Sequence, residues 1–174
     1  MFDADKIQQD KNLYAVEALP LVTVYDDNLF VRNDYDVLSL GQRNYLIAFF
    51  QKLGFKQKTG RLLTDGERKL HLPRPNSNLA VSGFSEDFLQ YDRVNFYCVT
   101  PTQFAEALFH FYSDPSEALP HLKALIENCP YNIEWLRDTS YRSEIEGATS
   151  ETFVDLMAYQ KQIVADKFKM KKTL

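Results

Sequence analysis

The stretch VTPTQF, residues 99–104, suggests chemistry because a predicted buried strand ends there and a helix begins. Helix N-termini that follow strands hold phosphates in many proteins, with glycines that let the backbone wrap the anion and a Lys and a Ser or Thr at fixed spacing. This stretch contains neither glycine nor lysine. Thr100 and Gln103 have the spacing of a capping box, and Pro101 suits the first helical position. We therefore expect these residues to cap a helix and not to bind an anion.

Three histidines, His71, His110 and His121, restrict the acid–base and metal chemistry that is open to the chain. His110 and His121 flank the loop between two expected helices, with Cys129 as a distant third candidate ligand. This spacing matches no zinc signature. We predict no metal and no cofactor: His71 faces solvent on a strand, His110 packs against aromatic side chains and His121 lies on the surface.

Nucleophilic catalysis needs a Ser, Cys or Thr that a neighbouring base activates. Ser39 and Ser82 lie outside any strand–nucleophile–helix elbow. Acids that are close together in turns are most often solvated or capping residues. Such acids here are Asp26, Asp27, Glu86, Asp87, Glu144 and Glu146. No catalytic residue is predicted, and the sequence favours a protein that is not an enzyme.

The charged side chains divide the chain into three blocks. Residues 1–39 hold eight acidic and three basic side chains, residues 40–74 hold two and eight, and residues 75–174 hold fourteen and nine. The whole chain has a formal net charge of −4 and a pI near 5.4. This balance argues against a dedicated nucleic-acid coat protein, although the basic block can still attract an anionic partner.

The basic block is the strongest candidate for a binding site. Its cations lie on a helix end, a linker and a predicted hairpin. A helix followed by a basic hairpin is the outline of a winged helix, but a winged helix has about three helices before the wing. The alternative is that these cations have no binding role and form a solvated face, whose positive charge balances the acidic remainder of the same molecule or of a second copy. The residues predicted to contact an anionic partner are Lys56, Lys58, Arg61, Arg68, Lys69 and Arg74.

These observations favour a non-catalytic module that associates with another protein or with itself. The sequence has no cofactor motif, and it combines 13 Phe and 10 Tyr with separated blocks of opposite charge. The first alternative is a nucleic-acid-binding protein that uses residues 52–74. The second is an enzyme whose acidic residues converge only in the fold.

A helix is predicted over residues 40–53. Ser39 and Gln42 have the spacing of a capping box, and Gly54 stands where a left-handed residue commonly ends a helix, with Phe55 available for the accompanying hydrophobic contact. The apolar positions at helical spacing are Leu46, Phe49, Phe50 and Leu53.

The segment before that helix reads mainly as β structure. Residues 5–19 have a poor apolar stripe and are assigned as a helix. Two β-rich runs at residues 21–25 and 29–32 surround a polar turn, which predicts a hairpin.

A second hairpin is predicted over residues 60–73, and its register follows from the side chains. We expect a three-residue loop of Thr64, Asp65 and Gly66, with Gly66 at positive φ. Leu62 then faces Arg68, and Arg61 faces Lys69. The side chains expected in the core are Leu62, Leu70 and Leu72, and those expected in water are Arg61, Lys69 and His71. A two-residue turn would place charge on the leucine face, which is costly.

The later chain is predicted to be mostly helical. A strand at 79–82 and a partly helical loop lead to a central strand at 94–99, which has bulky side chains on both faces. Helices follow at 101–112, at 115–128 with a break at Pro120, and at 150–171. Neither the helical nor the strand periodicity of apolar residues dominates residues 131–149, which contain Trp135, so no element is predicted there.

The resulting fold class is α+β: a mostly antiparallel sheet from hairpins in residues 20–100, with helices in residues 100–172 and one helix near 40–53. The 174 residues suit one globular domain, residues 1–174. The N-terminus resembles no signal peptide and no apolar run is long enough to cross a bilayer, so we expect a cytoplasmic protein with no membrane partner. Cys98 and Cys129 are expected to be buried, unreactive thiols.

Overall fold

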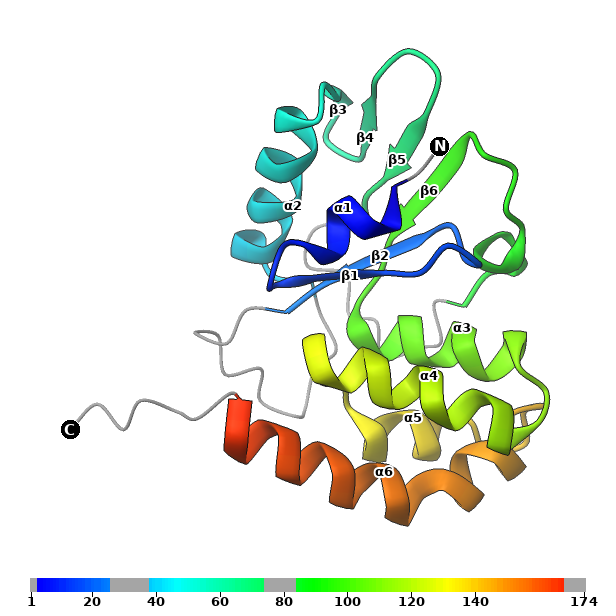
Figure 1. The fold of residues 1–174 in the computed structure, drawn as a ribbon. Coiled ribbons are helices and arrows are strands. Elements are labelled where there is room, and N and C mark those ends of the chain that lie inside the picture. Colours follow the sequence, from blue (N-terminus) through cyan, green and yellow to red (C-terminus); the bar gives the residue numbers. More distant parts are fainter. Residues whose placement is uncertain (1–2, 26–37, 74–83, 168–174) are drawn as a thin grey trace.

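The computed structural model describes residues 3–25, 38–73 and 84–167. Figure 1 shows strands β3–β5 at one end of the molecule and helices α3–α6 gathered at the other. The elements in chain order are α1 Ala4–Gln8, β1 Leu13–Ala15, β2 Leu21–Val24, α2 Leu40–Lys52, β3 Lys56–Thr59, β4 Leu62–Thr64, β5 Lys69–His71, the 3-10 helix η1 Glu86–Leu89, β6 Asn95–Cys98, α3 Pro101–Phe111, α4 Pro115–Asn128, α5 Ile133–Thr139 and α6 Glu146–Lys167.

The α+β class is confirmed, but the sheet is mixed. Its six strands lie in the order β1-β2-β6-β5-β4-β3. The β1–β2, β3–β4 and β4–β5 pairs are antiparallel, whereas β6 runs parallel to both β2 and β5. The sequence indicates that β6 is central, since both of its faces carry bulk, but it does not reveal the direction of strands that are distant in the chain.

Each face of the sheet contributes to a different hydrophobic cluster. On one face, α1 and α2 cover Leu63, Leu70 and Phe96. On the other face, α3–α6 pack with Tyr14 and Leu21 from the β1–β2 half. The two clusters together form the core, and the second cluster does not extend over β3–β5.

The N-terminal segment differs from the sequence-based expectation. The helix assigned to residues 5–19 is wrong in extent: α1 occupies Ala4–Gln8, and β1 follows at Leu13–Ala15. The strand at residues 21–25 is confirmed as β2, and its described partners are β1 and β6. The predicted second strand of that hairpin, residues 29–32, and the strand at 79–82 lie outside the described residues.

Helix α2 and both of its ends are confirmed. The Ser39 hydroxyl accepts the Gln42 N–H at 3.1 Å, and the Gln42 side chain accepts the Ser39 N–H at 2.9 Å. At the other end, Gly54 has φ +95°, and the N–H of Phe55 donates to the Phe50 carbonyl at 3.0 Å. The Phe50 and Phe55 rings are 5.3 Å apart, which supplies the expected hydrophobic contact.

The second hairpin is confirmed, but the predicted register is wrong. Leu63 pairs with Leu70 and Thr64 with Lys69, so the loop has four residues, Asp65 to Arg68. The Asp65 carboxylate accepts the Arg68 N–H at 2.7 Å and closes this loop, while Gly66 has the expected positive φ, +104°. The buried leucines are therefore Leu63, Leu70 and Leu72, and Leu62 is only half-buried.

The observed register gives the leucines the parity that we had rejected because it would bury charge. The structure adopts this parity without burying the charged groups. Arg61 lies in the β3–β4 turn, just before β4, and is exposed, and Arg68 lies in the loop beside Asp65. Both guanidinium groups share the parity of the buried leucines without entering the core. Lys69 is exposed as expected, whereas His71 is half-buried.

The helical part is confirmed with three differences. Helix α4 runs without interruption through Pro120, so the predicted break is wrong. Helix α6 begins at Glu146, before the predicted start at residue 150. Helix α5 lies within residues 131–149, where the sequence predicted no element. Among the described helices, none combines the length and apolar character that crossing a membrane requires.

Candidate functional site

Half of one sheet face carries no described helix. Helix α2 packs beside β3 on the α1–α2 face, and the helices on the opposite face contact β1 and β2. We call the remaining surface the open half-sheet. It consists of the outward side chains of β3–β6, which are Lys56, Thr59, Leu62, Thr64, Lys69, His71, Asn95 and Tyr97, together with exposed Lys58 at the register shift between Gln57 and Thr59.

Strand pairing arranges these side chains in two rows. Lys56, Thr64, Lys69 and Asn95 are successive cross-strand neighbours and form one row. Side chains alternate along a strand, and Thr64 and Lys69 are the chain neighbours of buried Leu63 and Leu70, so this row points to the opposite face, outward. Lys56 and Lys69 are exposed. The second row is Thr59, Leu62, His71 and Tyr97.

Four of the six predicted contact residues have side chains that remain available. Lys56, Lys58, Arg61 and Lys69 are exposed, and none lies within 4.0 Å of a carboxylate among the described residues. Lys52 at the end of α2 shares both properties. The structure therefore gathers cations from α2, β3, the β3–β4 turn and β5 at one end of the molecule, without an ion pair in the described part of the chain. Arg74 lies outside the described residues.

Arg68 is held in place by the β4–β5 loop. Its Nη2 lies 2.6 Å from the Asp65 carboxylate, its Nε donates to the same group at 2.7 Å, and its guanidinium lies 5.1 Å from the centre of the Phe55 ring. Partial burial opposes ionisation of Asp65, but hydrogen bonds from the Arg68 backbone and side chain outweigh it and lower the Asp65 pKa. Arg68 thus stabilises the loop and contributes little free charge.

The His71 and Tyr97 rings of the open half-sheet stack on each other. The His71 and Tyr97 rings are 5.0 Å apart and inclined by 20°, a separation close to the spacing of about 4.8 Å between neighbouring strands. The rings therefore stack along the sheet, and Phe88 packs on Tyr97 at 5.4 Å. Asn95 fixes the arrangement, because its Oδ1 lies 2.8 Å from His71 Nε2. The ring edges, and not their faces, point outward.

Acidic side chains border the open half-sheet beyond β6. Asp87 precedes Phe88, whose ring packs on Tyr97, and Asp92 accepts the N–H groups of Val94 and Asn95 just before β6. Burial raises the Tyr97 pKa, and the negative charges of Asp87 and Asp92 raise it further. Hydrogen bonds from the Asn95 backbone and side chain and from the Val94 backbone lower the Asp92 pKa. The Asp87 side chain is exposed and has no ion pair among the described residues.

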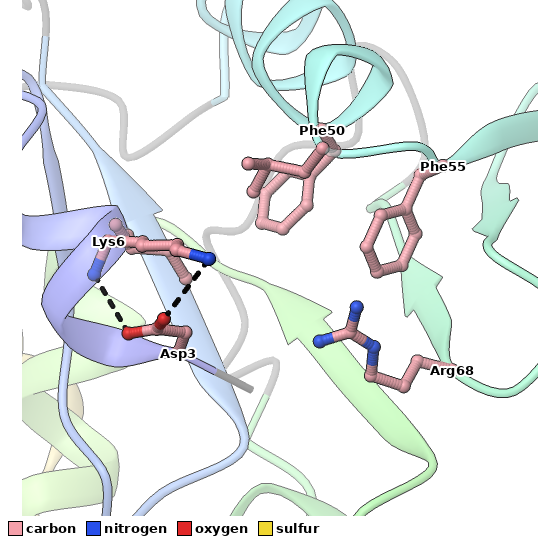
Figure 2. Close-up of a pocket in the computed structure, with 7 residues that line it drawn as sticks. Asp3, Lys6, Phe50, Phe55 and Arg68 are labelled. Atoms are coloured by element: carbon pink, nitrogen blue, oxygen red, sulfur yellow. Dashed lines mark hydrogen bonds and ion pairs between the residues drawn. The ribbon is translucent and has the colours of Figure 1, made fainter. Parts of the chain in front are cut away.

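A hollow of about 190 Å³ lies between α1, α2 and the β4–β5 loop (Figure 2). Its two cations are already paired, Lys6 with Asp3 at 3.6 Å and Arg68 with Asp65. Of its apolar lining residues, Ile7, Phe50 and Phe55 are almost completely buried, and Leu53 is 40% exposed. The hollow therefore presents little free charge to a ligand, and its exposed apolar surface comes from Leu53.

The three histidines stack on three different aromatic rings, those of Tyr97, Phe84 and Tyr112. His110 stacks on Phe84 at 4.0 Å, as expected, and burial lowers its pKa, although Glu144 and Glu86 oppose this shift. The expected surface position of His121 is only partly correct, since it is half-buried and stacks on Tyr112 at 4.2 Å. Within residues 3–25, 38–73 and 84–167, no three His, Cys, Asp or Glu side chains are grouped to hold a metal ion.

The strand-to-helix junction is a cap. The N–H of Gln103 donates to the Thr100 hydroxyl at 3.1 Å, and the N–H of Thr100 donates to the Gln103 side chain at 3.0 Å. Thr100 is only 1% exposed, so its hydroxyl is out of reach of a dissolved anion.

The acids considered for catalysis are dispersed. Glu86 and Asp87 are exposed on η1, while Glu146 accepts the Arg142 N–H at 2.8 Å at the start of α6. Glu144 is exposed, and Asp26 and Asp27 lie outside the described residues. None of these described acids has an arrangement that identifies it as a general acid or base.

Sequence reasoning missed Asn95, Tyr97 and Asp92 as parts of this surface. The alternation in residues 94–99 indicated that Asn95 and Tyr97 share a face, but it gave no neighbour for that face. Only the parallel pairing with β5 brings them beside His71 and Lys69. Comparison of the chain with protein-family models, with curated proteins and with solved structures found no match.

Proposed function

We propose that the protein is a non-catalytic binding module that docks an acidic protein surface on its open half-sheet. The observation that carries this proposal is the group of exposed cations that β3–β5 present together, chiefly Lys56, Lys58 and Lys69, none of which has an ion pair among the residues that the structure describes. Surface charges of this kind steer and select partners more than they add affinity.

The charge distribution of the rest of the chain supports a protein partner. Residues 40–73 hold seven basic and two acidic side chains, whereas residues 84–167 hold six basic and fourteen acidic side chains. An extended nucleic-acid backbone that leaves the basic end of this molecule meets a negative potential. A compact acidic surface that covers only the basic end avoids that repulsion.

The aromatic geometry also disfavours a single-stranded nucleic acid. Binding of single strands without sequence preference uses ring faces on which bases stack. The faces of His71 and Tyr97 are turned toward each other, and Tyr97 also contacts Phe88. The winged-helix outline loses its basis as well, because β4 and β5 lie inside a six-stranded sheet and do not project as a wing.

A location in the cytoplasm is part of this proposal. Cys98 and Cys129 are free and buried, which suits a reducing compartment.

The test is a binding titration at low salt with fluorescently labelled poly-L-glutamate and with oligothymidylate of matched length. We expect the protein to bind polyglutamate, and we expect the double change Lys56→Glu with Lys69→Glu to weaken binding by about tenfold or more. Lys161→Glu is the matched control, since Lys161 is exposed on α6, away from the open half-sheet. Preference for oligothymidylate that the double change abolishes would overturn the proposal in favour of nucleic-acid binding. Failure of both probes to bind would overturn anion docking altogether.

A further inference from the structure

We propose that the acidic partner of the open half-sheet is a second copy of this chain, so that two molecules pair face to face about a two-fold axis. This inference rests on the proposed function, and it names the partner. Its basis is that the surface carries both signs of charge, in an order that makes it complementary to itself.

The charges change sign across the strands. Lys56 and Lys58 lie on β3 at one side, and Lys69 lies two strands further in on β5. At the other side, η1 packs on β6 through Phe88, whose ring centre is 5.4 Å from that of Tyr97, and Asp87 is the residue before Phe88. Asp92 lies just before β6, where it accepts the N–H groups of Val94 and Asn95. Three strand spacings of about 4.8 Å separate β3 from β6, so the cationic and anionic sides are on the order of 14 Å apart.

The direction of the two-fold axis follows from this order. An axis that lies in the interface and runs along the strands reverses the order of the strands, so that β3 of one copy faces β6 and η1 of the other. Lys58 is the extra residue of the register shift in β3, so that Lys58 and Thr59 together lie opposite Leu62. In the dimer this pair faces Tyr97 and the region of Asp87. An axis across the strands would instead place lysines over lysines, which is unfavourable. Each favourable contact occurs twice, as in any two-fold interface.

Pairing of two sheets edge to edge is disfavoured. β3 is the exposed edge strand, and all four of its residues are exposed. Antiparallel pairing of two β3 strands with the sheet faces continuous would set Lys56 and Lys58 opposite the same lysines of the second copy. The strand also has a register shift between Gln57 and Thr59, and short, lysine-bearing, irregular edges resist pairing. For pairing through this part of the sheet, the face is therefore favoured over the β3 edge.

The interface is small. Four short strands offer much less than the roughly 800 Å² per partner of a standard stable complex. Its centre consists of half-buried groups such as Leu62 and His71, and its rim is charged. We therefore expect a weak dimer that forms at high protein concentration and dissociates as salt screens the rim.

Sedimentation over a wide range of protein concentration tests the dimer. At low salt we expect the average mass to rise from one chain toward two, and at about 0.5 M salt we expect one chain only. Lys58→Glu and Asp87→Lys should each weaken the dimer by about tenfold, because each places like charges together at both symmetric contacts. The Lys58 and Asp87 side chains have no ion pair among the described residues, so neither change removes a contact that stabilises the fold.

Two combinations make the test specific. The double variant Lys58→Glu with Asp87→Lys should dimerise again, and so should an equimolar mixture of the two single variants, since every contact then joins opposite charges. Lys161→Glu on α6 should leave the dimer unchanged.

The outcomes separate this inference from the proposed function. A chain that stays monomeric at low salt but binds polyglutamate would overturn the dimer and leave the proposed function intact. A dimer that persists in both single variants would overturn this surface as its interface. Mass that increases beyond two chains would overturn the two-fold arrangement in favour of head-to-tail association.

Discussion

Cys98 and Cys129 lie in the two different hydrophobic clusters, one on each face of the sheet. Burial raises the pKa of both thiols far above the ordinary value, and the positive charge of Arg43 offsets only part of this effect for Cys98. Since the thiolate is the reactive form, we expect no labelling of the native protein by a disulfide reagent at a pH of about 8. In urea, both thiols should react. Rapid labelling of either thiol in the native protein would contradict this burial.

Tyr14 links stability to alkaline pH. It is 4% exposed, and burial raises its pKa from 10.0 to about 12, with smaller contributions from the charges of Cys129, Tyr112 and Glu127. The unfolded chain therefore ionises first as the pH rises. The stabilisation is complete below pH 10 and is lost between pH 10 and about 12, with a fall of roughly 3 kcal/mol in the free energy of unfolding.

Urea unfolding at several alkaline pH values measures this effect. Tyr14→Phe should flatten the fall only in part, because burial also raises the pKa of Tyr131. Tyr141→Phe removes an exposed phenol, 65% accessible, and serves as the control. An equally steep fall in the Tyr14→Phe variant would show that Tyr14 does not titrate as the structure implies.

At the scale of elements, the end of α2 depends on one backbone conformation. Gly54 has φ +95°, and a Cβ there would meet no atom within 4 Å, so the obstacle to a side chain is the left-handed backbone itself. We expect Gly54→Ala to lower the free energy of unfolding by about 1 kcal/mol. Gly147→Ala is the matched control, because Gly147 is an open helical position in α6 without positive φ. Equal effects of the two changes in urea denaturation would contradict this explanation.

The elements also show which features a sequence can specify. The caps at Ser39, Thr100 and Gly54 are predictable because each depends on groups a few residues apart. The register of β4 and β5 was not predictable from alternation alone, because the Asp65–Arg68 contact lengthens the loop and changes the parity. The break expected at Pro120 does not occur. The helix α4 continues through that residue, because residues on both sides of it pack in the helical layer.

The candidate site was predictable to a similar degree. The exposure of Arg61 and Lys69 was predicted and is confirmed, although the register from which it was argued is wrong. Their placement beside Asn95 and Tyr97 required the parallel pairing of β5 with β6, which joins segments about 25 residues apart in a way that no short-range signal encodes.

At the scale of the whole molecule, the two hydrophobic clusters share strands. In β2, Leu21 belongs to the cluster under α3–α6, whereas Val22 belongs to the cluster under α1 and α2. In β6, Phe96 and Cys98 lie in one cluster, and Tyr97 packs against the other. Loss of either cluster would expose one side of these two central strands to water. The clusters should therefore stabilise each other.

We accordingly expect the chain to unfold in a single cooperative step, as one domain. Trp135 is the only tryptophan, and it reports on α5 in the helical layer, while far-UV circular dichroism reports on all helices and strands. The two urea transitions should coincide. The most protected amides of β4–β5 and of α3 should exchange with the same free energy of opening. Leu122→Ala creates a cavity in the helical cluster. It should lower the free energy of unfolding by the same amount with both probes, about 2 to 5 kcal/mol. If it instead lowered only the tryptophan transition, the helical layer would unfold independently, and the sheet would not couple the two halves.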